Sequence, residues 1–431
     1  MGRTCGRIRG AAGAPAQPGP FHHRRRREQE SGQISALHPS GGQSSRRAGD
    51  AAESGGAGRC RARRFRIRRV STADCIEVPV KIPGKSCRVL VGAGLIARAG
   101  ELVNATGLRG SCAIITDENV GRLHGAALQA ALEKTGCAAL LLAVPAGETS
   151  KCLAAAENLC DRMIAAGLDR GSFVVALGGG VVGDLAGFVA AIYQRGIPFV
   201  QIPTTIVAQV DSSIGGKTGV NARAGKNLIG AFHQPSLVLA DTATLVTLPG
   251  REYQEGFAEV IKHAVIRDAA MLGELDPGAP RESLAPLIAR NIAIKAAIVA
   301  DDEREQTGTR ALLNFGHTVA HAIENVAGYG RYLHGEAVSL GMAAALEIST
   351  RKYGLPAADA GRVRTKLAEY GLPLTLPADL ETGALLAAAR HDKKFSGGNI
   401  RYVVCPRIGE VFVADDVTEH DIRAAIDSLR E

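Results

Sequence analysis

The segment from Arg310 to His321 holds the densest set of reactive side chains in the 431-residue chain: a guanidinium, an amide and two imidazoles. If this segment is helical, His317 and His321 lie four residues apart and share a face. Asn314 and Arg310, three and seven residues before His317, then lie on the same side. Such a face suits a metal ion or an anionic substrate. A histidine pair at this spacing also occurs by coincidence on partly buried helices, so the pair alone leaves both interpretations open.

Two other segments offer metal ligands. One is Gly256–His263, a predicted helix in which Glu259 and Lys262 share a face, although an exposed ion pair would use the same spacing. The other is Tyr332–Val338, where His334 stands at the start of a further predicted helix. A catalytic zinc ion takes three nitrogen or oxygen ligands from the protein and keeps one position open. Glu259 with two of the histidines at 317, 321 and 334 meets that requirement.

A glycine-rich turn is the best candidate for cofactor binding. The apolar strand pattern Phe173–Leu177 runs directly into Gly178–Gly180, which opens a helix. Backbone amides in such a turn can approach a pyrophosphate, and a helix N-terminus favours its charge. The spacing is not GxGxxG, so a simple tight turn stays possible. Upstream, Glu148 and Lys151 follow another predicted strand and suit ribose hydroxyls or a phosphate.

Polar side chains also gather on a stretch punctuated by glycines, from Asp211 to Asn227. Its Gly215–Thr218 segment resembles a phosphate loop, but the first glycine and the preceding strand of a Walker motif are missing. A solvated basic loop is the alternative interpretation. The density of glycines, at 215, 216, 219, 225 and 230, indicates instead a backbone that a ligand approaches closely.

Apolar strands that alternate with amphipathic helices must position these groups. This order is typical of a parallel, doubly wound sheet with ligands at the carboxyl ends of its strands. From about residue 249 the strand patterns cease and helical patterns continue to residue 431. We therefore predict an α/β, Rossmann-like nucleotide-binding domain over 73–248 and an all-helical domain over 249–431. The predicted elements are a hairpin over 75–92, strands at 111–117, 138–144 and 173–177, and helices at 95–103, 125–134, 151–166 and 284–299.

The net charge of +8 comes from the first 72 residues, which contain 16 arginines, no lysine and four acidic residues. The rest of the chain is mildly acidic, and this charge argues against nucleic-acid binding by the folded part. Residues 1–72 are rich in Gly, Ala, Ser and Pro, so we expect a disordered basic tail. An organellar transit segment, a basic arm for an anionic surface, and a translated GC-rich sequence absent from the mature protein all fit. The absence of lysine favours the last.

Nine scattered cysteines without a CxxC pair indicate reduced thiols and a cytoplasmic location, with organellar import as the less favoured alternative. No uncharged run of about eighteen apolar residues is present, so we expect no membrane span.

These motifs resemble those of the 3-dehydroquinate synthases, which belong to the sugar-phosphate cyclases and are related in fold to glycerol and iron-type dehydrogenases. The resemblance covers about residues 75–431 and none of the tail. Its motifs occur in the family's order: Gly178–Phe188, Gln201–Gly219, Gly225–Gln234, Glu259–Lys262, Leu313–His321, His334–Val338 and Asp392–Lys394.

The resemblance implies a reaction of the shikimate pathway, the conversion of 3-deoxy-D-arabino-heptulosonate 7-phosphate to 3-dehydroquinate and phosphate. NAD+ transiently oxidises the ring carbinol, phosphate is eliminated, the ketone is reduced, and an intramolecular aldol step closes the carbocycle. A divalent metal, Zn2+ or Co2+, and a homodimer are also implied. The alternative is another sugar-phosphate cyclase, of the inosose or valiolone type.

The resemblance further assigns roles to individual residues. Glu259, His317 and His334 are the implied metal ligands. The implied substrate contacts are Arg195, Asn227, Asn314, His321 and Lys394 (of the Asp392–Lys394 motif) for the phosphate, Lys217, Lys262 and Arg310 for the carboxylate and hydroxyls, and Asp211 beside the C5 hydroxyl or nicotinamide. The implied NAD+ contacts are Asp117, Glu148, Lys151, Gly180, Val181, Val182, Gly183, Asp184, Thr204, Thr205, Lys217, Lys226, Thr244, Leu245, Val246 and Thr247.

Two features depart from the family pattern. Ala146 stands where relatives commonly have an acidic residue, and the segment Arg304–Thr309 is a residue longer than in many relatives, which leaves the role of Glu305 open. No implied catalytic position is lost.

Overall fold

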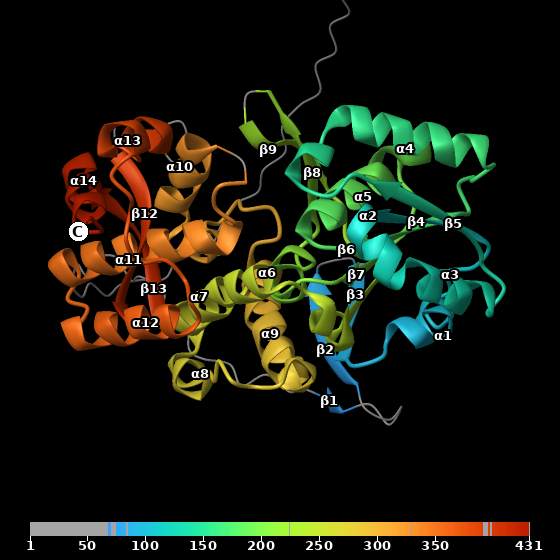
Figure 1. Ribbon diagram of the computed structural model, residues 1–431, viewed down its shortest axis with the longest axis horizontal. Helices are drawn as coiled ribbons and strands as arrows, with labels where there is room; N and C mark the ends of the chain where they lie inside the picture. The colour runs from blue at the N-terminus through green and yellow to red at the C-terminus, as the bar shows by residue number, and fades with distance from the viewer. Residues whose placement is uncertain are drawn as a thin grey trace, which may run out of the picture. The chain divides into compact units, whose positions relative to one another are not determined.

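An eight-stranded sheet occupies the first half of the chain, in the order β1-β2-β3-β10-β7-β6-β4-β5 (Figure 1). The computed structural model describes residues 68–69, 75–82, 85–223, 225–328, 330–390, 395–396 and 399–430. Strands β1 to β3 pair antiparallel, and β3 then starts a parallel series that continues to β5. The strands are β1 (Arg68–Arg69), β2 (Ile76–Ile82), β3 (Lys85–Gly92), β4 (Ser111–Asp117), β5 (Ala138–Val144), β6 (Phe173–Gly178), β7 (Phe199–Pro203) and β10 (Leu237–Asp241).

This sheet confirms the predicted hairpin and the predicted parallel strands. The tail expected over 1–72 lies outside the described residues, apart from β1. All described residues belong to one compact unit, Arg61–Glu431.

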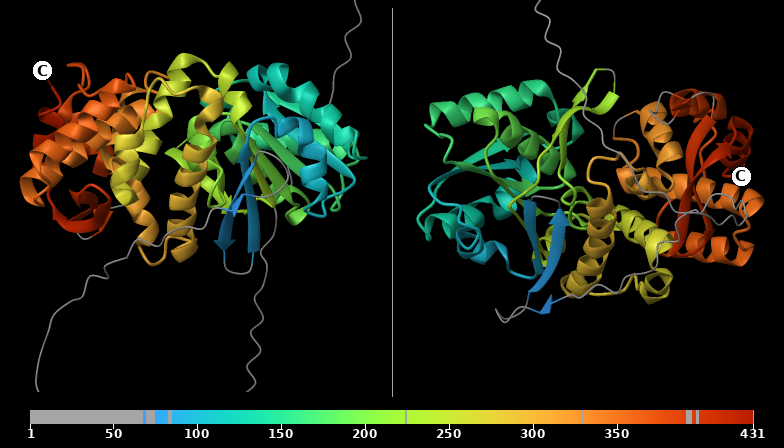
Figure 2. Two further views of the ribbon diagram at one scale, coloured as in Figure 1. Left: turned by 90° about the horizontal axis from the view of Figure 1, so that it is seen from below. Right: turned by 180° about the vertical axis from the view of Figure 1, so that it is seen from behind.

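Helices cover both faces of the parallel sheet, because its central strands are apolar on both sides. All of β6 is buried, and its side chains alternate between two core clusters. Val174 packs with Leu185 of α5 on one face, whereas Val175 packs with Leu128 of α3 on the other. Figures 1 and 2 show the two helical layers. Their helices are α1 (Ala99–Asn104), α2 (Glu118–Val120), α3 (Ala126–Glu133), α4 (Leu153–Ala165) and α5 (Gly180–Ile192).

A separate antiparallel hairpin stands beside the sheet and carries several predicted site residues. Its strands are β8 (Lys217–Ala222) and β9 (Gly225–Phe232). Gly219 and Gly230 face each other across it, and a Cβ added to Gly230 would lie 2.2 Å from the carbonyl oxygen of Thr218. These two glycines were predicted to mark the close approach of a ligand. They instead allow the two strands to pair closely.

The second half of the chain is mainly helical, as predicted. The expectation that strands cease after residue 249 is wrong in one part, because β11 (Phe395–Ser396), β12 (Asn399–Arg407) and β13 (Glu410–Val417) form a three-stranded antiparallel sheet. Buried side chains of β12 complete the helical core. The helices are α6 (Gly250–Glu255), α7 (Phe257–Arg267), α8 (Ala269–Glu274), α9 (Ala285–Asp301), α10 (His317–Ala327), α11 (His334–Lys352), α12 (Ala357–Glu369), α13 (Thr382–Arg390) and α14 (Glu419–Asp427).

The segment from Arg310 to His321 is not one continuous helix. A 3-10 helix, Thr309–Asn314, ends at Phe315, and α10 begins at His317. Gly316 between them has φ +79°, and a Cβ there would lie 2.7 Å from the backbone nitrogen of Met342. The left-handed glycine turns the chain before the histidines, so Arg310 and Asn314 are not on the face predicted from helical spacing.

One described helical segment, Arg281–Asp301, is long and apolar enough to cross a membrane by composition alone. In this fold 61% of its most apolar window is buried, and α9 packs against β2 and β3. The packing explains its apolar character, as in the core helices of other proteins.

Candidate active site

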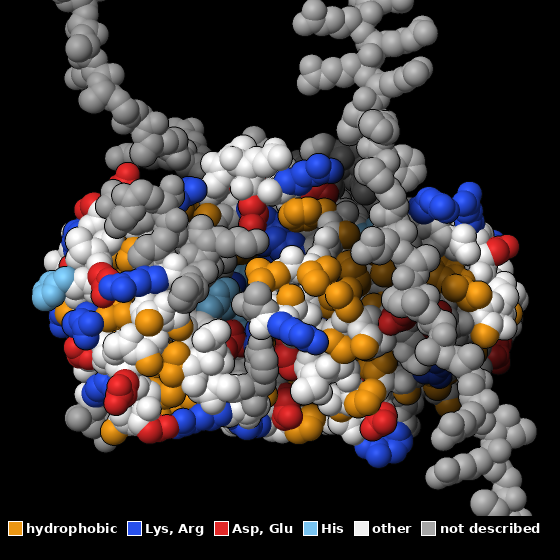
Figure 3. Space-filling view, turned by 90° about the horizontal axis from the view of Figure 1, so that it is seen from above, with side chains coloured by type: hydrophobic (Ala, Val, Ile, Leu, Met, Phe, Trp, Pro, Cys, Tyr) orange, Lys and Arg blue, Asp and Glu red, His pale blue; other side chains and the backbone are white. Residues whose placement is uncertain are grey.

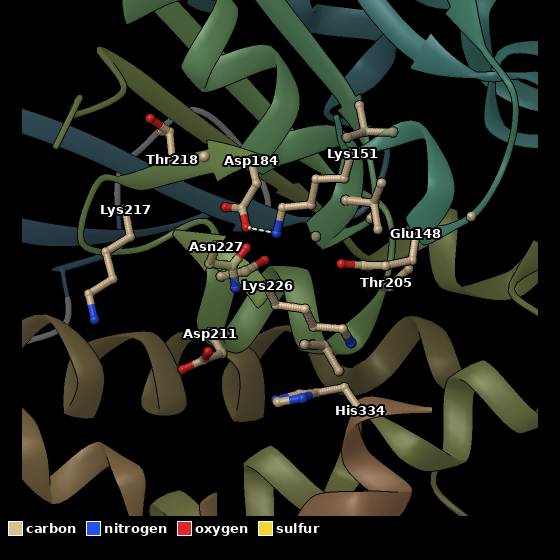
Figure 4. A pocket seen from close by; sticks show the side chains of 18 of the residues that line it. Glu148, Lys151, Asp184, Thr205, Asp211, Lys217, Thr218, Lys226, Asn227 and His334 are labelled. Carbon is tan, nitrogen blue, oxygen red and sulfur yellow. Dashed lines mark hydrogen bonds and ion pairs between the residues drawn. The ribbon is translucent and has the colours of Figure 1, made fainter. Parts of the chain in front are cut away.

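A cleft of about 1390 Å³ lies between the carboxyl ends of the parallel strands, the β8–β9 hairpin and the helices α10 and α11. Parallel α/β sheets commonly bind ligands at this edge. Figure 4 shows Lys151, Asp184 and Asn227 on one side of the cleft and His334 on the other. The fold thus brings the glycine-rich turn and the helical histidines into one site.

Three potential metal ligands converge at one end of this cleft. Glu259 of α7 is fully buried, and its Oε1 lies 3.6 Å from Nε2 of His317 and 3.5 Å from Nε2 of His334. The donor atoms of all three residues lie within 4.8 Å of one another. Neither carboxylate oxygen of Glu259 has a hydrogen-bond partner among the described residues, although Lys262 forms an ion pair with Oε2. A buried carboxylate between two imidazole nitrogens fits a divalent cation such as Zn2+.

For two of the three residues, Glu259 and His317, the electrostatic environment favours the protonation state that can bind a metal ion. Burial acts to raise the pKa of Glu259, but Lys262 and the two histidines hold it well below its ordinary value. Burial and Lys262 lower the pKa of His317 well below 6.5, so its imidazole is neutral. Although burial opposes it, Glu259 and Glu324 raise the pKa of His334 to about 10. A metal ion bound through His334 would have to displace a proton from this imidazole.

His321 stands apart from this group. Its ring centroid lies 5.5 Å from that of His317, but its side chain is exposed and lines the cleft. Of the histidines at 317, 321 and 334, the structure therefore brings the first and last together with Glu259 and leaves His321 facing the cleft.

A second acidic cluster next to the metal centre is already neutralised by lysines. Asp211 Oδ1 lies 2.8 Å from Nζ of Lys295, and His263 Nε2 lies 3.8 Å from the same oxygen. Burial and Lys262 lower the pKa of His263 to about 4, which keeps its ring neutral. Although Asp211, Glu259 and His263 have donor atoms within 4.8 Å of one another, ammonium groups provide the positive charge here.

Arg310 is held at the wall of the cleft by backbone contacts. Its buried guanidinium donates to the carbonyl oxygen of Gly215 at 3.2 Å and to that of Glu303. Asp302 holds the loop before it, because its carboxylate accepts the backbone N–H groups of residues 306, 307 and 310 at 2.7–3.1 Å. Burial acts to raise the pKa of Asp302, but these hydrogen bonds lower it to about 2.

The opposite wall has the features of a dinucleotide site. Helix α5 begins at Gly180 without a side-chain cap, so its N-terminal amides can bind an anion. Lys151 is buried and its Nζ lies 2.5 Å from Asp184 Oδ2, as Figure 4 shows. Burial raises the pKa of Asp184 despite this lysine. Glu148 accepts a hydrogen bond of 2.8 Å from the side-chain amide of Asn221, which orients its carboxylate at the same edge.

The predicted residues divide into those that line the cleft and those that do not. Glu259, Lys262 and His317 lie behind the lining, where they are buried. Lys394 lies outside the described residues. The lining residues are Asp117, Glu148, Lys151, Gly180, Val181, Val182, Asp184, Thr204, Thr205, Asp211, Lys217, Lys226, Asn227, Thr244, Thr247, Arg310, His321 and His334. The described residues absent from the lining, besides the three buried ones, are Gly183, Arg195, Leu245, Val246 and Asn314.

The charged residues of the cleft that the sequence interpretation did not assign include Lys295 and Glu324. Lys295 is the only charged residue in the apolar helical run 291–299, and this isolation was a usable signal. Glu324 follows His321 by three residues and resembles an ordinary surface carboxylate in sequence.

Comparison with known proteins gives a consistent result. The sequence model of the 3-dehydroquinate synthase N-terminal domain matches residues 141–255, and that of the C-terminal domain matches residues 256–395. The chain is 47% identical over 359 residues to a 3-dehydroquinate synthase of Caulobacter vibrioides, covering 80% of this chain and 97% of the relative. It is 50% identical over 354 residues to that of Symbiobacterium thermophilum, covering 79% and 97%.

Solved structures of related cyclases share the fold. A 2-deoxy-scyllo-inosose synthase complexed with carbaglucose-6-phosphate, NAD+ and Co2+ aligns with a TM-score of 0.74 at 25% identity, covering 82% of this chain and 99% of that one. A 2-epi-5-epi-valiolone synthase of Streptomyces hygroscopicus with NAD+ and Zn2+ aligns with a TM-score of 0.72 at 32% identity, covering 79% and 96%.

Proposed function

The chain belongs to the 3-dehydroquinate synthase family, and we propose that it converts 3-deoxy-D-arabino-heptulosonate 7-phosphate to 3-dehydroquinate and phosphate. The observation that carries the proposal is the convergence of Glu259, His317 and His334 at the wall of a cleft that also contains the N-terminus of α5. A redox cofactor and a metal ion can therefore act on one substrate.

We assign the metal to Glu259, His317 and His334, with Zn2+ or Co2+ as the ion. A bound divalent ion polarises vicinal oxygens of a substrate and stabilises negative charge that develops on them. Lys262 supports this centre by compensating the charge of the buried Glu259 carboxylate. His317 Nδ1 lies 3.2 Å from the carbonyl oxygen of Phe315, which leaves its Nε2 directed toward Glu259.

We assign the wall around α5 to NAD+, which takes a hydride from the substrate and returns it when bound. The N-terminal amides of α5 and the ammonium of Lys151 bind the pyrophosphate, and Glu148 and Asp117 suit ribose hydroxyls. Asp117 also caps α2 by accepting the backbone N–H groups of Asn119 and Val120. Its carboxylate is thereby oriented at the end of β4.

The cations and amides on the helical side suit the two anionic groups of the substrate. Lys217 and Arg310 bind the carboxylate and hydroxyls, while Asn227 and His321 bind the phosphate with Asn314 and Lys394. Lys217 also pairs with Glu305 at 2.5 Å, and its ammonium has further N–H donors for the substrate. These groups orient the sugar phosphate, and such orientation is itself catalytic.

Arg195 supports a homodimer as part of the proposal. It lies on an exposed turn with φ +72° and does not line the cleft of its own chain. We therefore assign this phosphate contact to the partner's Arg195 in a homodimer. Figure 3 shows apolar side chains gathered among charged ones on one face of the molecule, and such patches occur both at interfaces and at ligand-binding grooves.

The proposal also includes a cytoplasmic location and the division of the chain into a nucleotide-binding part, residues 73–248, and a helical metal and substrate part, residues 249–431. One core cluster contains Val89 of β3 and Ile292 of α9, so the two parts share apolar packing.

The competing function is that of another cyclase, since the structural neighbours above include inosose and valiolone synthases. The full chain with NAD+ and Zn2+ or Co2+ should be offered the heptulosonate phosphate and, separately, a hexose phosphate and a heptulose phosphate that lack its carboxylate. We expect phosphate release only from the first, with a product that a dehydroquinase consumes. Turnover of either other sugar phosphate in its place would replace the assignment.

A further inference from the structure

Glu324 lines the cleft beside His334 and contacts side chains from both sides of it. It belongs to α10, and its side chain is 10% exposed. Its Oε1 lies 3.6 Å from Nδ1 of His334 and 3.1 Å from Nζ of Lys226. Figure 4 shows Lys226 extending from the hairpin toward His334.

The imidazole of His334 is placed between two carboxylates. Nε2 faces Glu259 Oε1 at 3.5 Å, and Nδ1 faces Glu324 Oε1 at 3.6 Å. A histidine that binds metal through one nitrogen usually donates the N–H of its other nitrogen to a carboxylate or carbonyl oxygen. This contact selects the tautomer and orients the ring.

We propose that Glu324 is a positioning residue for His334: it holds Nδ1–H so that Nε2 is directed at the metal. The inference rests on the metal ligands assigned in the proposed function. For His317 the matching acceptor is the carbonyl oxygen of Phe315 at 3.2 Å. Both histidines then have a defined tautomer, each through a different kind of oxygen.

Lys226 makes the proposal testable, because it approaches the same oxygen of Glu324 as His334 does. If Glu324 only tied β9 to α10, removal of either partner of the ion pair would affect the metal centre alike. If Glu324 positions His334, loss of the Lys226 ammonium leaves Oε1 to His334 and preserves metal binding.

The experiment measures Zn2+ affinity of the metal-stripped full chain by competition with a chelator, and the visible absorption of the Co2+-loaded protein. We expect Glu324→Gln to weaken Zn2+ binding about 10- to 100-fold and to change the Co2+ bands. Lys226→Met should bind Zn2+ at least as tightly as the wild type. Glu369→Gln, which removes an exposed carboxylate paired with Lys366, is the matched control and should change neither readout.

The possible outcomes distinguish a failure of the role of Glu324 from a failure of the proposed metal ligands. Wild-type affinity in Glu324→Gln, with loss of Zn2+ binding in Glu259→Gln, overturns the role of Glu324 alone. If Glu324→Gln and Lys226→Met weaken Zn2+ binding equally, the role is also overturned, and Glu324 only joins β9 to α10 through its ion pair with Lys226. Unchanged binding in Glu259→Gln would instead refute the metal ligands of the proposed function. If Glu324→Gln does not fold, Glu324→Asp withdraws the carboxylate by one methylene and should show the same direction of change.

Discussion

The backbone oxygen of Glu255 lies where a side chain on Gly335 would have to be. A Cβ added to Gly335 would stand 1.9 Å from that oxygen, and the backbone N–H of Gly335 donates to Oε2 of the same glutamate at 2.6 Å. Gly335 follows His334 at the first turn of α11. The contact between α6 and α11 therefore determines where His334 can lie.

Gly335→Ala should destabilise the fold, because its Cβ would overlap backbone atoms that cannot rotate away. We expect a loss of about 1–3 kcal/mol in the free energy of unfolding, measured by denaturant titration. Gly273→Ala is the matched control, since that glycine is exposed in α8 with nothing within 4 Å of an added Cβ. It should be neutral or stabilise by about 0.5–1 kcal/mol. Equal stability of the two variants would contradict the close approach.

Asp302→Asn should lower both stability and affinity for the substrate, because the carboxylate holds the loop that presents Arg310. Loss of hydrogen bonds to a charged acceptor costs about 2 kcal/mol. Since the pKa of Asp302 is lowered from 3.8 to about 2, its contribution is present above pH 4 and is lost as the pH falls toward 2. The gap in unfolding free energy between wild type and variant should thus persist from pH 7 to 5 and narrow below 4. A difference in unfolding free energy that stays constant from pH 7 to below pH 4 would refute the role of the Asp302 charge.

Lys151→Met should weaken NAD+ binding by at least about tenfold, equivalent to about 1.4 kcal/mol, because it removes the buried ammonium beside the N-terminus of α5. It also leaves the Asp184 carboxylate buried without its partner. The double variant Lys151→Met with Asp184→Asn separates these effects: it should recover stability but not NAD+ affinity. Lys134→Met, an exposed lysine after α3, is the control. Isothermal titration with NAD+ provides the measurement, and unchanged affinity in Lys151→Met would remove this lysine from the cofactor site.

The sequence predicted the parallel sheet well because its signals are local. Fully apolar strands such as Phe173–Leu177 occur only where both faces are covered. The break at Gly316 could not be predicted in this way, since Arg310–His321 has a helical pattern and only contact with Met342 shows why the chain must turn. Strands β12 and β13 were missed because they lie among Ala-rich helices, with whose buried side chains they share one core.

Site residues that belong to a sequence motif could be predicted. Those whose role depends only on tertiary contacts could not. Glu259, His317 and His334 come from separate helices, and the fold brings them together as the family resemblance implied. The roles of Lys295 and Glu324 depend on what lies opposite them, namely Asp211 and His334. The exposure of Arg195 could not be inferred from the sequence.

The most direct test of the proposed metal site is the metal content of four purified full-length proteins, measured by inductively coupled plasma mass spectrometry after removal of loosely bound ions. Wild type and His321→Ala should each retain one Zn2+ or Co2+ per chain, and His321→Ala should be impaired only in phosphate release. Glu259→Ala and His334→Ala should retain none, because each removes a ligand from the buried group. One metal ion per chain in His334→Ala, or its loss in His321→Ala, would contradict the assignment of the site.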